Sequence, residues 1–254
     1  MFKGQFRILA GSAHDRKTKK RRAKKFHDQL KKLDKDAQDT ILRVQECTML
    51  MPNTLFSLIE AARYVHRYGI PGAVVECGVW RGGAMMAAAL TFKQLGVTDR
   101  SFYLYDTFTG MPKPTEKDKS LRGKTDPNEQ FRLTSTGPDS SDWCCAGLED
   151  VKRNLASVDY GQERFVTVEG KVEETIPSTI PEEIAVLRLD TDWYESTKHE
   201  MEHLFPRLVP KGVLIIDDYF CWSGSQQAVD EYLAAAKIPI YLTKVNSSAV
   251  GVRP

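Results

Sequence analysis

Short apolar runs alternate with segments of helical periodicity along most of this chain. The runs are rich in Val, Ile, Leu and aromatic residues and predict strands at 73–79, 101–107, 164–170, 184–190 and 212–217. Segments with apolar residues three or four positions apart predict helices at 54–68, 82–95, 148–158, 196–208 and 226–236. This alternation indicates a mostly parallel sheet with helices on both faces. The last segments, 240–245 and 249–253, predict an antiparallel pair of strands with no helix between them.

Two segments lie outside this alternation. Residues 1–46 are polar and rich in lysine, and we expect a basic helical appendage there, with helices at 19–33 and 36–45. Residues 110–147 are rich in Pro, Asp, Ser, Thr and Lys, and so long a stretch inside a compact domain is typical of a lid. We therefore predict an N-terminal appendage at 1–46 and one α/β domain at 47–254, which carries a lid-like insertion at about 110–147.

The composition favours a globular protein of the cytoplasm. Of the 254 residues 41% are hydrophobic, and the formal net charge is +2, so no overall field favours nucleic acid. No run approaches the ~20 apolar residues of a membrane helix, and we expect no secretory signal in residues 1–10. The 5 cysteines include no CxxC pair, and we expect reduced thiols, including the adjacent Cys144 and Cys145.

The positive charge is concentrated in one basic run, residues 16–25. Such a run is compatible with a tail that binds nucleic acid or an acidic membrane surface. It is also compatible with a solvated arm or the exposed start of a helix. We favour the solvated arm, because no aromatic residues that could stack on bases interrupt the run.

Two of the predicted strands each end in a pair of carboxylates. Asp190 and Asp192 follow the strand at 184–190, and Asp217 and Asp218 follow the strand at 212–217. Ligands of open α/β sheets bind at the carboxyl ends of the strands, and four acids close together need a cation or a proton between them. Oxygen ligands suit a hard divalent ion such as Mg²⁺. The alternative is that these residues are turn formers and helix caps.

A glycine-rich turn follows the first predicted strand. The sequence Glu-Cys-Gly-Val-Trp-Arg-Gly-Gly at 76–83 joins a strand to a helix, where backbone N–H groups are free to meet a ligand. It is neither a P-loop nor a GxGxxG motif. The next strand ends in Asp106, which either accepts hydrogen bonds from ribose hydroxyls or caps a turn. S-adenosylmethionine, which carries no phosphate, suits this turn better than NAD does.

Several ordered segments resemble the macrocin O-methyltransferase (TylF-type) family. They are 76–83, the Tyr-Asp-Thr-Phe-Thr-Gly-Met-Pro segment at 105–112, and the Leu-Arg-Leu-Asp-Thr-Asp-Trp-Tyr-Glu-Ser-Thr segment at 187–197. The likeness extends to 48–50, 69–72 and 215–219, so it covers the chain from about residue 47 to its end, with 113–147 divergent. It implies a Rossmann-like class I methyltransferase fold, with a mostly parallel seven-stranded sheet and an antiparallel C-terminal strand.

The resemblance also implies a function and assigns roles. The family consists of sugar O-methyltransferases of natural-product pathways that depend on S-adenosylmethionine and a divalent metal such as Mg²⁺, and its members form oligomers. Asp190 is implied as the catalytic base, with Asp192 as second choice, and the metal ligands as Asp190, Asp217 and Asp218. The residues implied to contact the cofactor are Thr48, Met49, Glu76, Gly78, Arg81, Gly82, Gly83, Asp106, Thr107, Ser140, Gly170, Val172 and Asp190.

Other interpretations stay open at this point. A catechol-type O-methyltransferase would share the metal and the cofactor but take an aromatic diol. A nucleic-acid-binding module would use the basic arm. His199 and His203 have the spacing of a metal pair on a helix, but their position favours a solvated or partly packed face. The aromatic residues beside the acids suit either stacking on an acceptor or core packing: Trp193, Tyr194, Tyr219 and Trp222.

Overall fold

The structure is a computed structural model that describes residues 13–123 and 125–254. Its helices are α1 (Ala13–Leu30), α2 (Lys35–Val44), α3 (Pro52–Arg67), α4 (Gly83–Gln94), α5 (Pro127–Thr134), α6 (Leu148–Ala156), α7 (Val172–Thr175), α8 (Tyr194–His203) and α9 (Ser223–Ala236). Its strands are β1 (Ala73–Cys77), β2 (Phe102–Asp106), β3 (Ser135–Gly137), β4 (Ser140–Ser141), β5 (Phe165–Glu169), β6 (Ile184–Leu189), β7 (Leu208–Ile216), β8 (Thr243–Val245) and β9 (Ser248–Val252).

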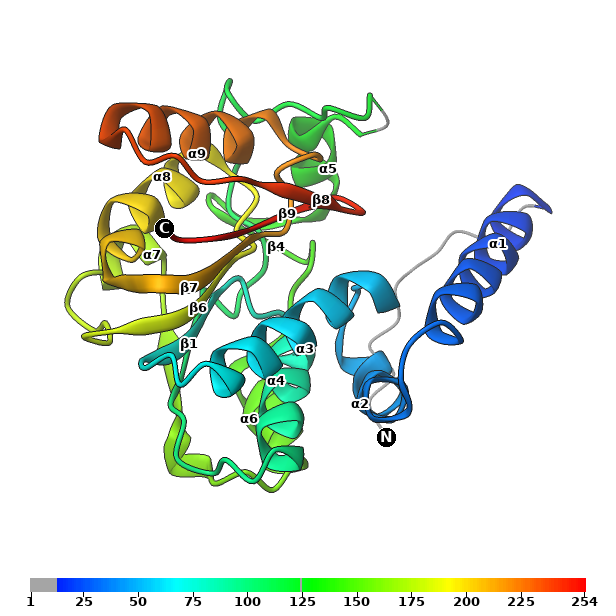
Figure 1. The fold of residues 1–254 in the computed structure, drawn as a ribbon. Coiled ribbons are helices and arrows are strands. Elements are labelled where there is room, and N and C mark those ends of the chain that lie inside the picture. The colour runs from blue at the N-terminus through cyan, green and yellow to red at the C-terminus, as the bar shows by residue number, and fades with distance from the viewer. Residues whose placement is uncertain (1–12, 124) are drawn as a thin grey trace.

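Seven of these strands form one twisted sheet in the order β5-β2-β1-β6-β7-β9-β8 (Figure 1). The pairs from β5 to β7 are parallel, whereas β9 is antiparallel to both β7 and β8. This confirms the predicted fold class, a mostly parallel seven-stranded sheet with an antiparallel C-terminal strand. The parallel strands all end at one edge, so the residues that follow them meet there.

The core lies on both faces of the sheet, because successive strand residues point to opposite sides. On β7, Val213 and Ile215 pack with α2, α3, α4 and α6, while Leu214 and Ile216 pack with α7, α8 and α9. The predicted helix at 196–208 begins earlier, at Tyr194, and ends at His203, where a short 3-10 turn containing Pro206 follows. Proline lacks the N–H that would continue the helix.

The expected appendage at 1–46 divides into two parts with different packing. Thr18 to Lys25 on α1 are exposed, and Figure 1 shows most of α1 projecting from the rest of the molecule, whereas Leu30 at its C-terminal end is buried in the core. By contrast, Ala37, Ile41 and Val44 on α2 are fully buried and belong to the core. Residues 1–12 and the side chains of 13–17 lie outside the described residues. None of the described helices is long and apolar enough to cross a membrane.

The insertion at 110–147 contains the helix α5 and the small β3-β4 hairpin, and it is fastened to the start of α8. The carboxylate of Asp118, 1% exposed, accepts a hydrogen bond from the backbone N–H of Tyr194 at 2.8 Å. The indole Nε1 of Trp193 donates to the carbonyl of Pro112 at 3.0 Å. These contacts hold the insertion over the edge of the sheet where the parallel strands end.

Candidate active site

The carboxyl ends of β1, β2, β6 and β7 open into one cavity of about 800 Å³. Most residues predicted for the cofactor and the metal line it: Thr48, Met49, Glu76, Gly78, Gly83, Asp106, Thr107, Gly170, Val172, Asp190, Asp217 and Asp218. Three predicted cofactor residues, Arg81, Gly82 and Ser140, are not among its lining residues. The strand topology therefore gathers residues from position 48 to position 218 at one place.

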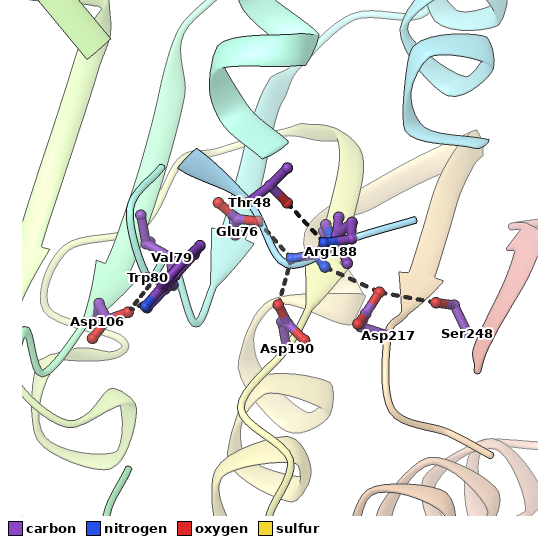
Figure 2. A network of polar contacts seen from close by, with 10 residues as sticks. Thr48, Glu76, Val79, Trp80, Asp106, Arg188, Asp190, Asp217 and Ser248 are labelled. Atoms are coloured by element: carbon purple, nitrogen blue, oxygen red, sulfur yellow. Dashed lines mark hydrogen bonds and ion pairs between the residues drawn. The ribbon is translucent and has the colours of Figure 1, made fainter. Parts of the chain in front are cut away.

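The side chain of Asp106 accepts hydrogen bonds from the backbone of the glycine turn after β1. The Oδ2 atom of Asp106 accepts hydrogen bonds from the backbone N–H groups of Val79 at 2.7 Å and Trp80 at 3.0 Å (Figure 2). Its Oδ1 atom accepts from the N–H of Phe108 at 2.8 Å. Burial raises the pKa of Asp106, and these N–H groups oppose that effect. Asp106 thus supports the turn and also lines the cavity.

The glycines of this turn are explained mainly by close approach to protein backbone. A Cβ atom on Gly78 would lie 2.1 Å from the carbonyl oxygen of Asp190, and one on Gly83 would lie 2.3 Å from that of Cys47. Gly78 also has a φ of +81°, which favours glycine. The small residues let β1 meet the end of β6, and this brings Glu76 and Asp190 to the same cavity.

Arg81 has a structural role outside the cavity. Its Nε atom donates to Asp150 on α6 at 2.7 Å, and its Nη1 atom donates to the carbonyl of Glu46 at 2.7 Å. The guanidinium therefore ties the glycine turn to α6 and to the segment after α2. Ser140 lies on β4, where its hydroxyl accepts a hydrogen bond from Thr136 at 3.1 Å.

The centre of the site is Arg188, a buried cation that contacts three carboxylates (Figure 2). Its Nη1 atom donates to Glu76 at 2.6 Å and to Asp190 at 2.8 Å, and its Nη2 atom lies 3.0 Å from Oδ1 of Asp217. The side chains of Arg188 and Glu76 are 2% and 1% exposed. Oδ1 of Asp217 also accepts a hydrogen bond from Ser248 at 2.9 Å. Arg188 therefore fixes acids from three neighbouring strands.

Three of the strand-end acids form a second group. Asp190, Asp192 and Asp218 each offer an oxygen within 4.8 Å of the others. The structure thus groups Asp192 with Asp190 and Asp218, in the place that the sequence analysis gave to Asp217. Asp217 faces Arg188 and Ser248 instead. Asp192 has a φ of +68°, an uncommon conformation for a residue other than glycine that often marks functional sites.

The acids of this group affect one another's ionisation. Burial raises the pKa of Asp192 to about 7, and the negative charges of Asp190 and Asp217 add to the effect. Burial also raises the pKa of Asp190 and of Asp218 well above the ordinary range. Carboxylates this close cannot all ionise without a compensating positive charge. The group is therefore suited to a cation.

Three tryptophan side chains pack against one another, and two of them line the same cavity as the acids. Trp143 from the insertion, Trp193 after β6 and Trp222 before α9 lie edge to face, with ring centroids 5.2 to 6.2 Å apart. Trp193 is buried, whereas Trp143 and Trp222 are partly exposed and line the cavity. His199 and His203 lie apart from the acids: the Nε2 atom of His199 is 2.9 Å from the carbonyl oxygen of Ile176, and the two rings lie against each other.

The residues that sequence reasoning missed are one charged residue inside the sheet and several residues from the N-terminal helix and the insertion. Arg188 was overlooked as a site residue, although a charged residue within the apolar run 184–189 is itself a signal, because buried charges are paired. Trp143 and the basic residues Lys25 and Arg122 also line the cavity. Their positions depend on how the N-terminal helix and the insertion fold back, and no local pattern encodes that.

Comparison with known structures first defines the class. The chain is similar to the O-methyltransferase NovP, with a TM-score of 0.71 and 28% identity over 82% of each chain. It is also similar to a calicheamicin methyltransferase, with a TM-score of 0.61 and 21% identity over 100% of this chain and 98% of the other. With the seven-stranded sheet and a cavity at its carboxyl edge, these similarities define a class I O-methyltransferase, and the protein is an enzyme.

The family follows from the sequence comparisons. Residues 3–253 match the model of the family described as macrocin-O-methyltransferase (TylF), and this protein belongs to that family. It is 35% identical over 185 residues to mycinamicin III 3''-O-methyltransferase of Micromonospora griseorubida, covering 73% of this chain and 69% of the relative. It is 29% identical over 203 residues to demethyldecarbamoylnovobiocin O-methyltransferase of Streptomyces niveus, covering 80% and 74%. The resemblance found in the sequence is confirmed.

Proposed function

We propose that this enzyme transfers the methyl group of S-adenosylmethionine to a hydroxyl of a sugar in a glycosylated natural product, with the help of a divalent cation such as Mg²⁺. The observation that carries the proposal is the meeting of a glycine turn, a row of strand-end acids and partly exposed indoles in one cavity. The relatives named above methylate, by their names, mycinamicin III and demethyldecarbamoylnovobiocin. Sugar rings stack well on indole rings, and Trp143 and Trp222 line the cavity.

The cofactor half of the cavity suits a cationic ligand without phosphate. Oε2 of Glu76 is buried and has no hydrogen-bond partner among the described residues, so it leaves an acceptor for the ammonium group of the cofactor's methionine part. Asp106 lies beside the turn, where a carboxylate meets ribose hydroxyls. Thr48, Gly83, Gly170 and Val172 complete the lining on this side. We assign this half to S-adenosylmethionine.

The acidic half of the cavity suits a hard divalent cation. Asp190, Asp192 and Asp218 present carboxylate oxygens within 4.8 Å of one another, and these side chains would hold a divalent cation between them. All three are carboxylates, the ligand type that Mg²⁺ prefers. We assign Asp190 and Asp218 as ligands, with Asp217 outside the set because Arg188 and Ser248 hold it. A bound divalent ion would lower the pKa of a sugar hydroxyl and orient it.

The same geometry distinguishes the roles of Asp190 and Asp192. Asp190 accepts a hydrogen bond from Arg188, which holds its oxygen in place and opposes the rise in the pKa of Asp190 that burial causes. Asp192 receives no such bond from Arg188, and its pKa of about 7 suits a group that takes a proton at neutral pH. We therefore propose Asp192, the second choice of the sequence analysis, as the residue that accepts the hydroxyl proton.

A methyl-transfer assay with two classes of acceptor tests the proposal. Purified enzyme with S-adenosylmethionine and Mg²⁺ is given a panel of deoxysugar glycosides in one series and catechols in the other. We expect S-adenosylhomocysteine to form only with glycosides. Turnover with catechols alone would overturn the sugar assignment and favour the catechol-type alternative. A homo-oligomer and a cytoplasmic location stay predictions.

A further inference from the structure

We propose that Glu200, a buried residue of α8, is a positioning residue that fixes the place of Asp192 through the hydroxyl of Thr191. The inference rests on the proposed function and deepens it, because it names a residue that the proposed base needs although that residue does not line the cavity. Two observations carry it. Asp192 lies at the centre of a strained turn, and an incompletely paired carboxyl of the core accepts a hydrogen bond from the first residue of that turn.

The turn that carries Asp192 has an uncommon backbone geometry. The N–H of Trp193 donates to the carbonyl of Thr191, two residues back, at 2.8 Å, and Asp192 between them has a φ of +68°. This combination is that of the rarer, strained form of the γ-turn. A strained backbone persists only where the surrounding structure holds it in place. The position of the Asp192 carboxylate therefore depends on the contacts that fix Thr191 and Trp193.

Contacts from two different parts of the fold fix the two ends of this turn. After Asp192, the insertion holds Trp193, whose indole Nε1 atom donates to the carbonyl of Pro112 at 3.0 Å. Before Asp192, the hydroxyl of Thr191 donates to Oε2 of Glu200 at 3.2 Å. Within the described part of the chain, this is the one side-chain hydrogen bond of Thr191. Glu200 is thus the side-chain anchor for the first half of the turn.

Packing alone does not account for a glutamate at position 200. The residue is 0% exposed, and its Oε1 atom has no hydrogen-bond partner among the residues that the structure describes. Leaving a buried oxygen unpaired costs free energy, and an unbranched apolar residue such as methionine would avoid that cost. Burial raises the pKa of Glu200 well above its ordinary range, which favours the neutral carboxyl. Glutamine, which is also neutral, would keep an acceptor oxygen for Thr191.

Variants that remove this hydrogen bond from either end test the role of Glu200. Glu200→Met removes the acceptor and Thr191→Val removes the donor. We expect each to lower kcat for glycoside methylation by about tenfold or more at saturating S-adenosylmethionine and Mg²⁺, because a reacting group misplaced by about 1 Å can cost 10²-fold. The KM of the acceptor and the affinity for S-adenosylhomocysteine should stay as in the wild type. Glu200→Gln keeps an acceptor oxygen and should restore most of kcat.

Urea unfolding separates positioning from a structural role. Because Glu200→Met removes an unpaired buried oxygen, this variant should be at least as stable as the wild type. Thr91→Val on α4 is the matched control: Thr91 is 1% exposed, donates to the carbonyl of Ala87 at 2.8 Å and does not line the cavity. This control loses a buried hydrogen bond and should keep kcat. If Glu200→Met loses kcat and is also less stable than Thr91→Val, Glu200 is a structural residue and the inference fails.

A double-mutant cycle decides whether Glu200 acts through Asp192. If it does, adding Glu200→Met to Asp192→Asn should lower kcat no further, because the group that Glu200 positions is already lost. Effects that multiply would place the action of Glu200 elsewhere and overturn the inference. If Asp192→Asn loses activity while Glu200→Met keeps wild-type kcat, the inference fails and the proposed function stands. If only catechols turn over, the sugar assignment fails, and the same cycle with a catechol still decides the role of Glu200.

Discussion

Arg188 on β6 donates a hydrogen bond of 2.6 Å to Glu76 on β1, and the two side chains are almost completely buried. The same guanidinium reaches Asp190 and Asp217. Because Glu76 lies on the side proposed for the cofactor and Asp190 on the side proposed for the cation, one residue connects the two halves of the cavity. A buried ion pair of this kind gives little net stability, but removing one partner leaves an unpaired charge.

Replacement of Arg188 should therefore affect stability and both ligands. We expect Arg188→Met to lower the free energy of unfolding by about 3 to 5 kcal/mol, because three acids lose their counter-charge. Urea unfolding measures this. Arg132→Met is the control, because Arg132 makes a solvent-exposed ion pair with Glu129, and such pairs contribute little to stability. Arg188→Lys keeps the positive charge but loses the several N–H donors of the guanidinium. This variant should fold, but it should bind S-adenosylhomocysteine more weakly than the wild type does. Wild-type affinity in Arg188→Lys would contradict the connecting role.

The proposed base predicts a difference between two neighbouring acids. Asp192→Asn should lower kcat by about 10²-fold or more, because proton transfer to a positioned group contributes that much, while S-adenosylhomocysteine affinity stays unchanged. Asp190→Asn should in addition weaken Mg²⁺ binding, since Asp190 is assigned as a ligand. Steady-state kinetics and calorimetry separate the two effects. If Asp192→Asn keeps most of the activity and Asp190→Asn loses it at saturating Mg²⁺, the base is Asp190, as the resemblance first implied.

The raised pKa of Asp192 predicts how stability depends on pH when no metal is added. The pKa rises from 3.8 in the unfolded chain to about 7 in the folded one, so the folded state binds the proton more tightly. Its stabilising contribution is complete below pH 4 and is lost as pH rises through about 7. In EDTA, the unfolding free energy should fall between pH 5 and 8, and less steeply in Asp192→Asn. Stability that rises over this interval in the wild type and the variant alike would contradict the assignment.

The fold was predictable because each parallel strand is a buried apolar run and the helices between them are periodic. The family resemblance added the expectation of seven strands with an antiparallel strand at the C-terminal end. The predicted ends of the strands also gave the position of most of the site. Parallel strands end at one edge of the sheet, and Glu76, Asp106, Asp190 and Asp218 lie at that edge. The partners of each acid were not predictable: whether Asp217 or Asp192 joins Asp190 depends on Arg188 and Ser248, which approach from β6 and β9.

The packing of the N-terminal segment shows a second limit. α1 and α2 are both polar in sequence, yet α2 has a buried face formed by Ala37, Ile41 and Val44. Their spacing of three or four residues was present in the sequence, but the high charge around them concealed it. Long-range contacts such as that of Arg22 with the carbonyl of Met49 leave no local trace in either partner.

The cation site predicts metal-dependent thermal stability. A ligand that binds only the folded state stabilises it in proportion to the logarithm of its concentration. We expect Mg²⁺ to raise the Tm of the wild type, EDTA to reverse the increase, and Asp190→Asn and Asp218→Asn to abolish it. Asp142→Asn is the control, because Asp142 is exposed on the insertion and lies outside the acidic group. An equal increase in Tm for Asp218→Asn and the wild type would place the ion elsewhere.

The close approach of Gly78 to Asp190 predicts a large cost for a single methyl group. In Gly78→Ala the new Cβ would meet the carbonyl oxygen of Asp190 at 2.1 Å, and backbone atoms cannot yield as a flexible side chain does. Gly69→Ala is the matched control: its φ of +61° imposes a similar conformational penalty of about 1 to 2 kcal/mol, but no atom lies within 4 Å of its Cβ. We expect Gly78→Ala to be less stable than Gly69→Ala by about 2 kcal/mol or more in urea unfolding.

The Gly78→Ala variant should also bind S-adenosylhomocysteine more weakly, because the displaced turn carries the N–H groups that donate to Asp106. Equal free energies of unfolding in the two variants would mean that β1 and β6 can move apart at Gly78 at no cost in stability. The close approach of Gly78 to Asp190 would then not be what positions the site.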